Sequence, residues 1–208
     1  MGLLCLRQGN LPRALPLLER AVRLCQDADL PALFPLLAAA LGVAYTLAGR
    51  LADAVPLLMR VMEQMAATEA YFETVCRLFL GEAQVLAGRL EDAHALAEGA
   101  LAHARAYQER DNEAYALRLL GAIAAQREPP EAEPAAEYYR QAIALAAELG
   151  MRPLQAHCHR GLGTLYANLG HRAQAHGELS AALELYRAMD MTFWLPQAEA
   201  ALAQAEGR

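Results

Sequence analysis

The chain has 208 residues, which is enough for one or two domains with a substantial core. Hydrophobic residues make up 56% of the chain and aromatic residues 6%, and the excess is alanine and leucine, so the composition predicts an all-α fold. The net charge of −6 argues against nucleic acid as a partner, because neutralising phosphates requires a positive surface.

Membrane segments and export signals are not expected. The longest apolar run, residues 30–41, is interrupted by Pro31 and Pro35 and is too short to span a bilayer. The first ten residues lack a basic leader and an apolar core of signal length. The four cysteines form no CxxC pair, a pattern typical of reduced core residues in the cytoplasm. We therefore expect a cytoplasmic protein without a membrane partner.

Similar segments recur along the chain about every 40 residues. LAGRLADA at 47–54 returns as LAGRLEDA at 86–93, with seven of eight residues identical. A marker glycine stands at the same place in every copy, at Gly2, Gly42, Gly81, Gly121 and Gly163. Each copy resembles the tetratricopeptide repeat, a helix-turn-helix in which this glycine is position 8. The period is longer than the usual 34 residues of that repeat.

Small residues and turn glycines explain why the pattern folds as paired helices. Position 20 of the repeat holds Ala14, Ala54, Ala93, Ala135 and Ala175. Small side chains at positions 8, 20 and 27 predict that paired helices approach closely. A second set of glycines follows the first helices, at Gly9, Gly49, Gly88 and Gly170. There we expect a left-handed turn, which glycine adopts at almost no cost.

The first three copies are expected at about 1–28, 29–68 and 69–109. Their helices are predicted near 1–8, 11–26, 31–48, 51–67, 69–87 and 90–108. Pro16 and Pro56 lie about one turn into second helices, where we expect a slight kink without breakage. The first copy begins at repeat position 7, so most of its first helix is missing. We therefore expect the chain to be the C-terminal piece of a longer protein.

The fourth and fifth copies are expected at about 110–150 and 151–190, followed by a cap segment at 191–208. Their helices are predicted near 111–127, 133–149, 152–169 and 172–188, with a capping helix near 192–206. The acidic, proline-broken loop REPPEAEP (127–134) adds two residues to the fourth copy. Phe193 and Trp194 are expected to pack beneath the cap. We expect one domain, residues 1–208, forming a right-handed α-solenoid of tetratricopeptide-like helix pairs.

The first helices of such an array line a concave groove, which repeat positions 2, 5, 9, 12 and 13 typically face. The candidate partner-binding residues at these positions are Leu36, Val43, Leu47, Leu78, Glu82, Tyr115, Arg118, His157, Arg160, Thr164 and Asn168. The N-terminal half of this set is nearly all apolar, whereas the C-terminal half is polar and basic. The clamp with Lys at position 5 and Asn at position 9, found in the chaperone-binding subclass, is absent.

The two halves of the groove predict different contacts. The apolar half is expected to be covered by a peptide, a protein partner, a neighbouring domain of the parent protein or a second copy of the chain. The alternative is that these residues pack on one another in a narrow superhelix. Arg118 and Arg160 are candidates to receive a carboxylate, the alternative being ordinary solvated charges.

The sequence favours no catalytic, cofactor or metal site. The only serine, Ser180, lies within a predicted helix, and no phosphate-binding loop or zinc-protease motif occurs. The segment QAHCHRGLG (155–163) resembles a ligand cluster, but residues two apart on a helix point away from each other. We expect His159 to pack inward, Cys158 to face a neighbour or solvent, and His157 to face the groove.

Residues 148–202 closely resemble the C-terminal tetratricopeptide region of large bacterial signalling proteins. In these proteins a class III adenylate/guanylate cyclase domain, or another sensor or effector, precedes an AAA-type signal-transduction ATPase module. The resemblance implies a non-catalytic regulatory arm that binds a protein or peptide. The alternative is a sensor of a small ligand or peptide signal. The resemblance carries over no catalytic residue, because the cyclase and ATPase motifs lie outside these residues.

Overall fold

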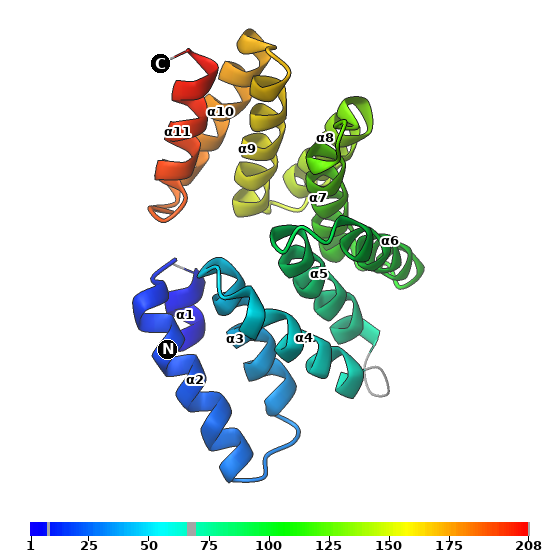
Figure 1. Ribbon diagram of the computed structural model, residues 1–208, viewed down its shortest axis with the longest axis vertical. Coiled ribbons are helices and arrows are strands. Elements are labelled where there is room, and N and C mark those ends of the chain that lie inside the picture. The colour runs from blue at the N-terminus through cyan, green and yellow to red at the C-terminus, as the bar shows by residue number, and fades with distance from the viewer. Residues whose placement is uncertain (8, 66–69, 208) are drawn as a thin grey trace. The chain divides into compact units, whose positions relative to one another are not determined.

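The computed structural model describes residues 1–7, 9–65 and 70–207 (Figure 1). Within these residues the chain forms eleven helices and no strands. The helices are α1 (Gly2–Arg7), α2 (Leu11–Asp27), α3 (Phe34–Leu47), α4 (Leu51–Met65), α5 (Ala70–Leu86), α6 (Leu90–Ala106), α7 (Arg110–Gln126), α8 (Ala132–Glu148), α9 (Arg152–Asn168), α10 (Arg172–Ala188) and α11 (Leu195–Ala205). None of the described helices is long and apolar enough to cross a membrane.

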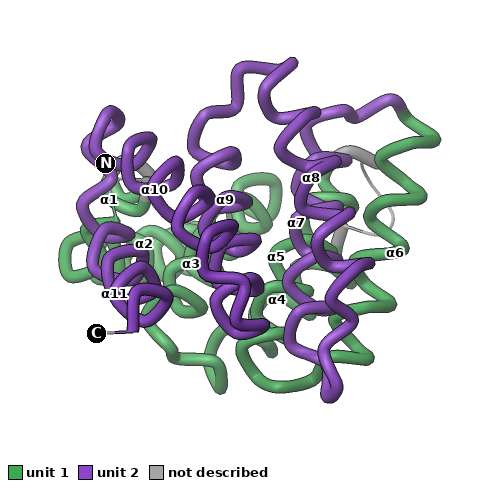
Figure 2. The backbone as a smooth tube through the Cα atoms, turned by 90° about the horizontal axis from the view of Figure 1, so that it is seen from above, with its two compact units in different colours: residues 1–107 green, residues 108–208 purple. Residues whose placement is uncertain are grey.

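The chain divides into two compact units, Met1–Tyr107 and Gln108–Arg208, which Figure 2 colours separately. In the N-terminal unit α1 packs on α2, α3 on α4 and α5 on α6, and each pair also packs on the next. In the C-terminal unit α7 pairs with α8 and α9 with α10, while α11 packs on both α10 and α9. This sequence of helix pairs confirms the predicted all-α repeat architecture.

The helix ends follow from local sequence. Asn10 caps α2, because its side-chain oxygen accepts a hydrogen bond from the backbone N–H of Arg13 at 3.3 Å. The third helix begins at Phe34 rather than near residue 31. Pro35 lies in its first turn, where a backbone N–H would have no partner within the helix, so proline costs no hydrogen bond there. The prolines at 16 and 56 lie inside α2 and α4, which run through them unbroken as predicted.

The tight turns between paired helices have the predicted left-handed glycines. Gly9, Gly49, Gly88 and Gly170 have φ angles of 71°, 73°, 73° and 77°. At Gly49 the turn is closed by a hydrogen bond from the Arg50 N–H to the Tyr45 carbonyl at 2.9 Å. The fourth copy differs as expected, because five residues separate α7 from α8 where three separate α9 from α10.

The marker glycines admit a large side chain from the second helix of the same pair. A Cβ atom added at Gly42 would lie 2.6 Å from Leu58, and one added at Gly163 would lie 2.6 Å from Leu179. At Gly121 the same role falls to Tyr139, whose ring atoms would lie 3.1–3.2 Å away. All five position-20 alanines are fully buried, at 0% exposure. Both observations confirm close approach within each pair.

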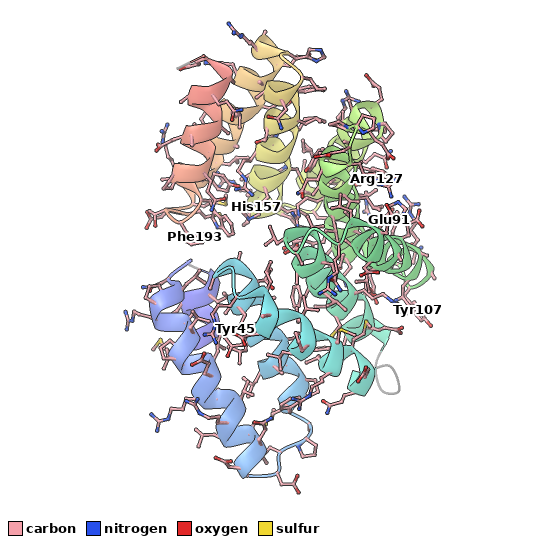
Figure 3. The ribbon with its side chains drawn as sticks, viewed as in Figure 1. Tyr45, Glu91, Tyr107, Arg127, His157 and Phe193 are labelled. Atoms are coloured by element: carbon pink, nitrogen blue, oxygen red, sulfur yellow. The ribbon has the colours of Figure 1, made fainter. Side chains whose placement is uncertain are left out.

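Tyrosine hydroxyls fix consecutive pairs against each other. The hydroxyl of Tyr45, which is labelled in Figure 3, lies 3.0 Å from a Glu19 carboxylate oxygen on the preceding second helix, and Arg50 binds the same oxygen. In the C-terminal unit Arg140 donates to the Tyr166 hydroxyl at 3.1 Å. Tyr45 and Tyr166 both occupy repeat position 11, so a position-11 tyrosine contacts the preceding second helix in both places, as a donor to Glu19 of α2 and as an acceptor from Arg140 of α8.

Candidate functional site

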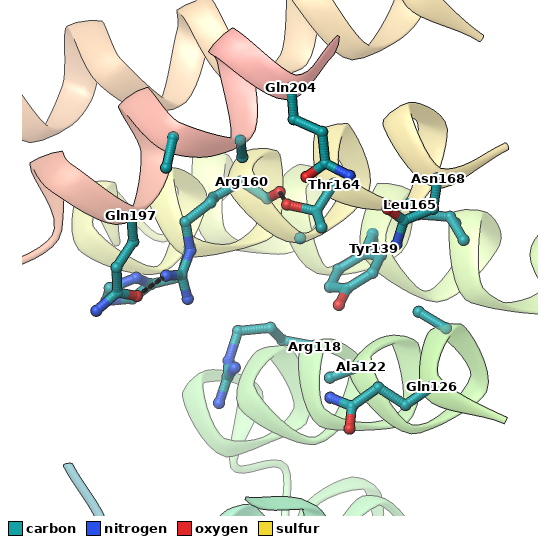
Figure 4. Close-up of a pocket in the computed structure, with 15 residues that line it drawn as sticks. Arg118, Ala122, Gln126, Tyr139, Arg160, Thr164, Leu165, Asn168, Gln197 and Gln204 are labelled. Atoms are coloured by element: carbon teal, nitrogen blue, oxygen red, sulfur yellow. Dashed lines mark hydrogen bonds between the residues drawn. The ribbon is translucent and has the colours of Figure 1, made fainter. Parts of the chain in front are cut away.

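A pocket of about 470 Å³ opens in the C-terminal unit among α7, α8, α9 and α11 (Figure 4). It is lined by Arg118, Ala122, Ala125, Gln126, Tyr139, His157, Arg160, Gly161, Thr164, Leu165, Asn168, Gln197, Ala200, Ala201 and Gln204. Five of the candidate groove residues therefore meet here: Arg118, His157, Arg160, Thr164 and Asn168. The lining contains no carboxylate, although the chain has 24 acidic residues.

The repeat sets the order of the polar groups along the pocket. Arg118 on α7 and Arg160 on α9 share repeat position 5, and Gln126 and Asn168 share position 13. First helices of successive copies run in the same direction, so the two arginines lie toward one end and the two amides toward the other (Figure 4). Eight residues of helix separate these ends by about 12 Å.

The capping helix α11 completes the pocket, a contribution that the repeat pattern does not predict. Gln197, Ala200, Ala201 and Gln204 of α11 all face it. Their spacing of three, four and seven residues places them on one side of a helix. This spacing is the feature of the sequence that could have indicated their role, because it places two glutamines and two alanines on the side of the cap helix that faces the pocket. Because α11 packs on α10 and α9 as α9 packs on α8 and α7, it takes the place of a sixth first helix.

Arg160 is held by neutral groups. Its Nη1 donates a hydrogen bond to the Gln197 side-chain oxygen, drawn as a dashed line in Figure 4. Its guanidinium carbon also lies 5.7 Å from the centre of the Trp194 ring, within cation–π range. Acidic residues on α10 and α11 pair elsewhere: Glu178 with His159, and Glu199 with Arg187. The charge of Arg160 is therefore positioned at the pocket without being neutralised by these carboxylates.

His157 is partly buried between two aromatic side chains. Its Nδ1 lies 2.7 Å from the Tyr186 hydroxyl, and its ring meets the Trp194 ring edge-on at 4.8 Å between centroids. Figure 3 shows His157 and Phe193 at the same end of the α9–α11 group. Burial, together with the smaller effect of the Arg118 and Arg160 charges, lowers the pKa of His157 to about 3. The imidazole is therefore neutral at neutral pH, and the two guanidinium groups supply the positive charge.

Tyr139 forms the wall of the pocket on the α8 side. Its side chain lies so close to α9 that a Cβ at Gly161 would be 2.6 Å from its hydroxyl oxygen. Burial raises the pKa of Tyr139 to about 12, so the phenol stays protonated. Gly161, which the sequence presents only as a neighbour of the marker Gly163, is thus required for this aromatic wall.

The other candidate residues lie away from this pocket. Leu36, Val43, Leu47, Leu78 and Glu82 belong to the N-terminal unit. Leu36 is 47% exposed and Leu78 is 5% exposed, while the other three are partly buried. Tyr115 is on α7 and is 38% exposed, but it does not line the pocket. Partner binding at these six positions stays a prediction.

The adjacent His–Cys–His residues separate in the structure, with a different order of burial from the one expected. Cys158 is the innermost, at 0% exposure, and burial raises the pKa of its thiol to about 12. His159 is only partly buried, and its Nδ1 lies 2.6 Å from a Glu178 oxygen on α10. Among the residues that the structure describes, no group of three His, Cys, Asp or Glu side chains could hold a metal ion.

A threonine, a histidine and a glutamate form a polar chain between α5 and α6. The Thr74 hydroxyl lies 2.8 Å from His103 Nδ1, and His103 Nε2 lies 3.6 Å from a Glu73 oxygen. The order resembles a nucleophile–base–acid relay. Thr74 is 0% exposed, however, and the Tyr107 ring stacks on His103 at 4.4 Å. A substrate has no access to the buried hydroxyl, so this chain of contacts connects the two helices.

No family model and no curated protein matches the sequence. Solved structures do match in fold. BtubC (BKLC) from P. vanneervenii has a TM-score of 0.63 and 17% identity, over 97% of this chain and 86% of that one. The apo form of RapI has a TM-score of 0.61 and 16% identity, over 91% of this chain and 54% of that one.

A third match is a putative kinesin light chain from Podosopora anserina with nearly identical TPR-like repeats. Its TM-score is 0.56 at 21% identity, over 96% of this chain and 90% of that one. At these identities the likeness concerns the fold. Together with the paired helices and their turn glycines, it gives the chain the fold of tetratricopeptide-like repeat proteins.

Proposed function

We propose that this chain is a non-catalytic regulatory module that binds a peptide or protein segment in the pocket of its C-terminal unit. The observation that carries the proposal is the pocket itself, which has a volume of about 470 Å³. It is lined by two arginines and by six glutamine, asparagine, threonine and histidine side chains from the first helices α7 and α9 and from the cap helix α11. Its volume lies in the range of sites that enclose a ligand. Its lining is built mostly on helices, which hold binding groups rigidly.

The finer setting of the module is also part of the proposal. The resemblance of residues 148–202 to bacterial cyclase–ATPase signalling proteins supports a role as the C-terminal arm of such a protein in the cytoplasm. Occupation of the pocket would then regulate the attached effector domains. The pocket joins α7, α9 and α11, so a ligand that contacts all three changes how consecutive repeats pack, which is how a solenoid transmits a local event.

The test is a selection of random peptides displayed on phage against the immobilised chain. Counter-selection against the Arg160→Gln variant removes peptides that bind other surfaces. We expect enriched peptides that bind with 1:1 stoichiometry by calorimetry and lose affinity for the variant. Enrichment of no peptide, or only of peptides that bind the variant equally well, would contradict the proposal.

The second candidate function is a sensor for a small molecule. The specific observation in its favour is that the pocket also has the size of a metabolite site and is closed on one side by α11. A thermal-shift screen of metabolites distinguishes the two functions. Stoichiometric stabilisation by a small molecule, together with failure of the peptide selection, would favour the sensor over the peptide-binding module.

A further inference from the structure

We infer that the C-terminal pocket binds a short extended peptide segment bearing one carboxylate. The carboxylate lies between Arg118 and Arg160, and the main chain of the segment runs from there toward Gln126 and Asn168. This inference rests on the function proposed above and names the chemistry of its ligand. Three features carry it: the sign of the pocket's charge, the order of its polar groups and the size of the residues between them.

The charge of the pocket selects an anion. Two guanidinium groups face it from adjacent first helices, and the lining supplies no carboxylate of its own. A carboxylate has two oxygens that can each accept a hydrogen bond from a guanidinium, and such charge-assisted bonds are stronger than neutral ones. His157 adds no charge, because it is neutral and holds Tyr186.

A single carboxylate fits the available donors better than a phosphate group. Arg160 already gives one N–H to Gln197 and stacks on Trp194. Arg118 also has another interaction within the chain. A phosphate carries close to two negative charges and three acceptor oxygens, so it needs more donors than these partly engaged groups retain.

The opposite end of the pocket suits a peptide main chain. The amide side chains of Gln126, Asn168 and Gln204 each both donate and accept hydrogen bonds, as a peptide group does. They lie about 12 Å from the arginine end, a distance that three to four extended residues span. Between the two ends Ala122 and Thr164 present small side chains, which leave room for a backbone to approach α7 and α9.

Gln197 holds the place of the ligand's carboxylate in the free chain. Its amide oxygen accepts a hydrogen bond from Arg160 and, unlike a carboxylate, brings no negative charge to offset the positive charge of the guanidinium. Binding therefore replaces a neutral acceptor by an ionised one. Because Arg160 also lies over Trp194, the only tryptophan in the chain, this exchange changes the environment of a unique fluorophore.

The probes are four tetrapeptides and one small acid. Acetyl-Glu-Ala-Ala-Ala-amide and acetyl-Ala-Ala-Ala-Glu-amide place a side-chain carboxylate at either end. Acetyl-Ala-Ala-Ala-Ala with a free C-terminus tests the other source of a carboxylate, and acetyl-Ala-Ala-Ala-Gln-amide is the neutral control. Glutarate tests a carboxylate without a peptide. The full chain is titrated with each probe, followed by tryptophan fluorescence and calorimetry.

We expect the carboxylate-bearing peptides to bind at least about tenfold more tightly than the glutamine peptide, because loss of one charge-assisted pair costs about that factor. They should also bind more tightly than glutarate, which has carboxylates but no peptide groups to pair with the amides of Gln126 and Asn168. The two glutamate peptides and the peptide with a free C-terminus show which source of carboxylate is preferred. Equal affinity for the glutamate and glutamine peptides would overturn the inference. Equally tight binding of glutarate would overturn it as well.

Three variants locate the binding. Arg160→Gln should reduce affinity for the glutamate peptide at least about tenfold. Arg152→Gln removes the same charge from an exposed position of the same helix and should change affinity less than about threefold. In a double-substitution cycle, Arg160→Gln should hardly change the affinity for the glutamine peptide, because that peptide has no carboxylate to pair with Arg160. Additive losses would overturn the pairing.

Gln197→Glu is a variant that gains an interaction, so a negative result does not reflect unfolding. The new carboxylate would pair with Arg160 from within the chain and compete with the ligand. We expect an unchanged or higher melting temperature together with at least about a tenfold loss of affinity for the glutamate peptide. Unchanged affinity would place the ligand elsewhere.

Failure of this inference is distinguishable from failure of the proposed function. If peptides selected by phage display bind and respond to Arg160→Gln but bind equally well with glutamate replaced by glutamine, the function stands and the carboxylate inference falls. If no peptide binds, selected or synthetic, both fall.

Discussion

At the scale of single residues, the neutral state of His157 is the feature with the clearest consequence. The ring is held between Tyr186 and Trp194, and the nearby charges of Arg118 and Arg160 oppose its protonation. A protonated imidazole here would lose solvation and meet two like charges. Folding of the C-terminal unit therefore depends on keeping this histidine uncharged.

We predict that the C-terminal unit loses stability as the pH falls from about 6.5 to about 3. The native state binds the His157 proton only near its lowered pKa of about 3, whereas the unfolded chain binds it near 6.5. Between these values the unfolded state holds more protons, so the free energy of unfolding decreases as the pH is lowered, by at most about 5 kcal/mol. Urea titrations at several pH values measure this slope.

Two variants isolate the contribution of His157 from that of the carboxylates. His157→Gln removes the titrating group and should flatten the dependence of unfolding free energy on pH over this window. His171→Gln makes the same change at an exposed position and should leave the dependence as in the parent chain. Equal slopes in all three proteins would contradict the role assigned to His157.

At the scale of helices, the marker glycine decides how tightly each pair packs. Gly163 on α9 sits against Leu179 and Glu178 of α10, and Gly42 sits against Leu58 in the same way. The contact is between a backbone and a buried side chain, so neither partner has room to move. The repetition of this contact explains why glycine returns at the same position of every copy.

We predict that Gly163→Ala destabilises the chain by about 1–3 kcal/mol, because its Cβ would lie 2.6 Å from Leu179. Gly177 is the matched control: it lies within α10, and a Cβ added there meets nothing within 4 Å. Gly177→Ala should stabilise by about 0.5–1 kcal/mol, since alanine favours helix over glycine. Chemical denaturation measures the change in the free energy of unfolding of each variant, which should be negative for Gly163→Ala and positive for Gly177→Ala. A stable Gly163→Ala variant would show that α9 and α10 can separate without cost.

At the scale of the whole molecule, the two compact units differ in what they offer a partner. Every residue of the pocket lies within 108–208, from Arg118 on α7 to Gln204 on α11. Cohesion in repeat proteins comes from contacts between neighbouring helices. The C-terminal unit has its own succession of such contacts, from α7 through α11.

We predict that residues 108–208, produced alone, fold into a helical domain that keeps the pocket. Circular dichroism should show a cooperative thermal transition, and the glutamate peptide should bind within about threefold of its affinity for the full chain, because no lining residue is lost. Cooperative folding with lost affinity would show that the pocket needs the N-terminal unit. The matching fragment 1–107 lacks every lining residue and should not bind the peptide.

The repeat, the helix pairs, the turn glycines and the longer loop after α7 could all be predicted from the sequence. These features depend on local rules. Glycine occurs where φ is positive, alanine occurs where two helix backbones meet, and the helical periodicity can be recognised within a single segment. The sequence also placed Arg118, Arg160 and Asn168 correctly on first helices, because repeat position fixes which side of a helix a residue occupies.

Three features emerge only from the packing of the helices: α11 closes the pocket, Tyr139 forms a wall against Gly161, and Cys158 is buried more deeply than His159. Each of these depends on contacts between different helices. Such contacts arise from shape and distance in three dimensions, which periodicity along one helix does not encode.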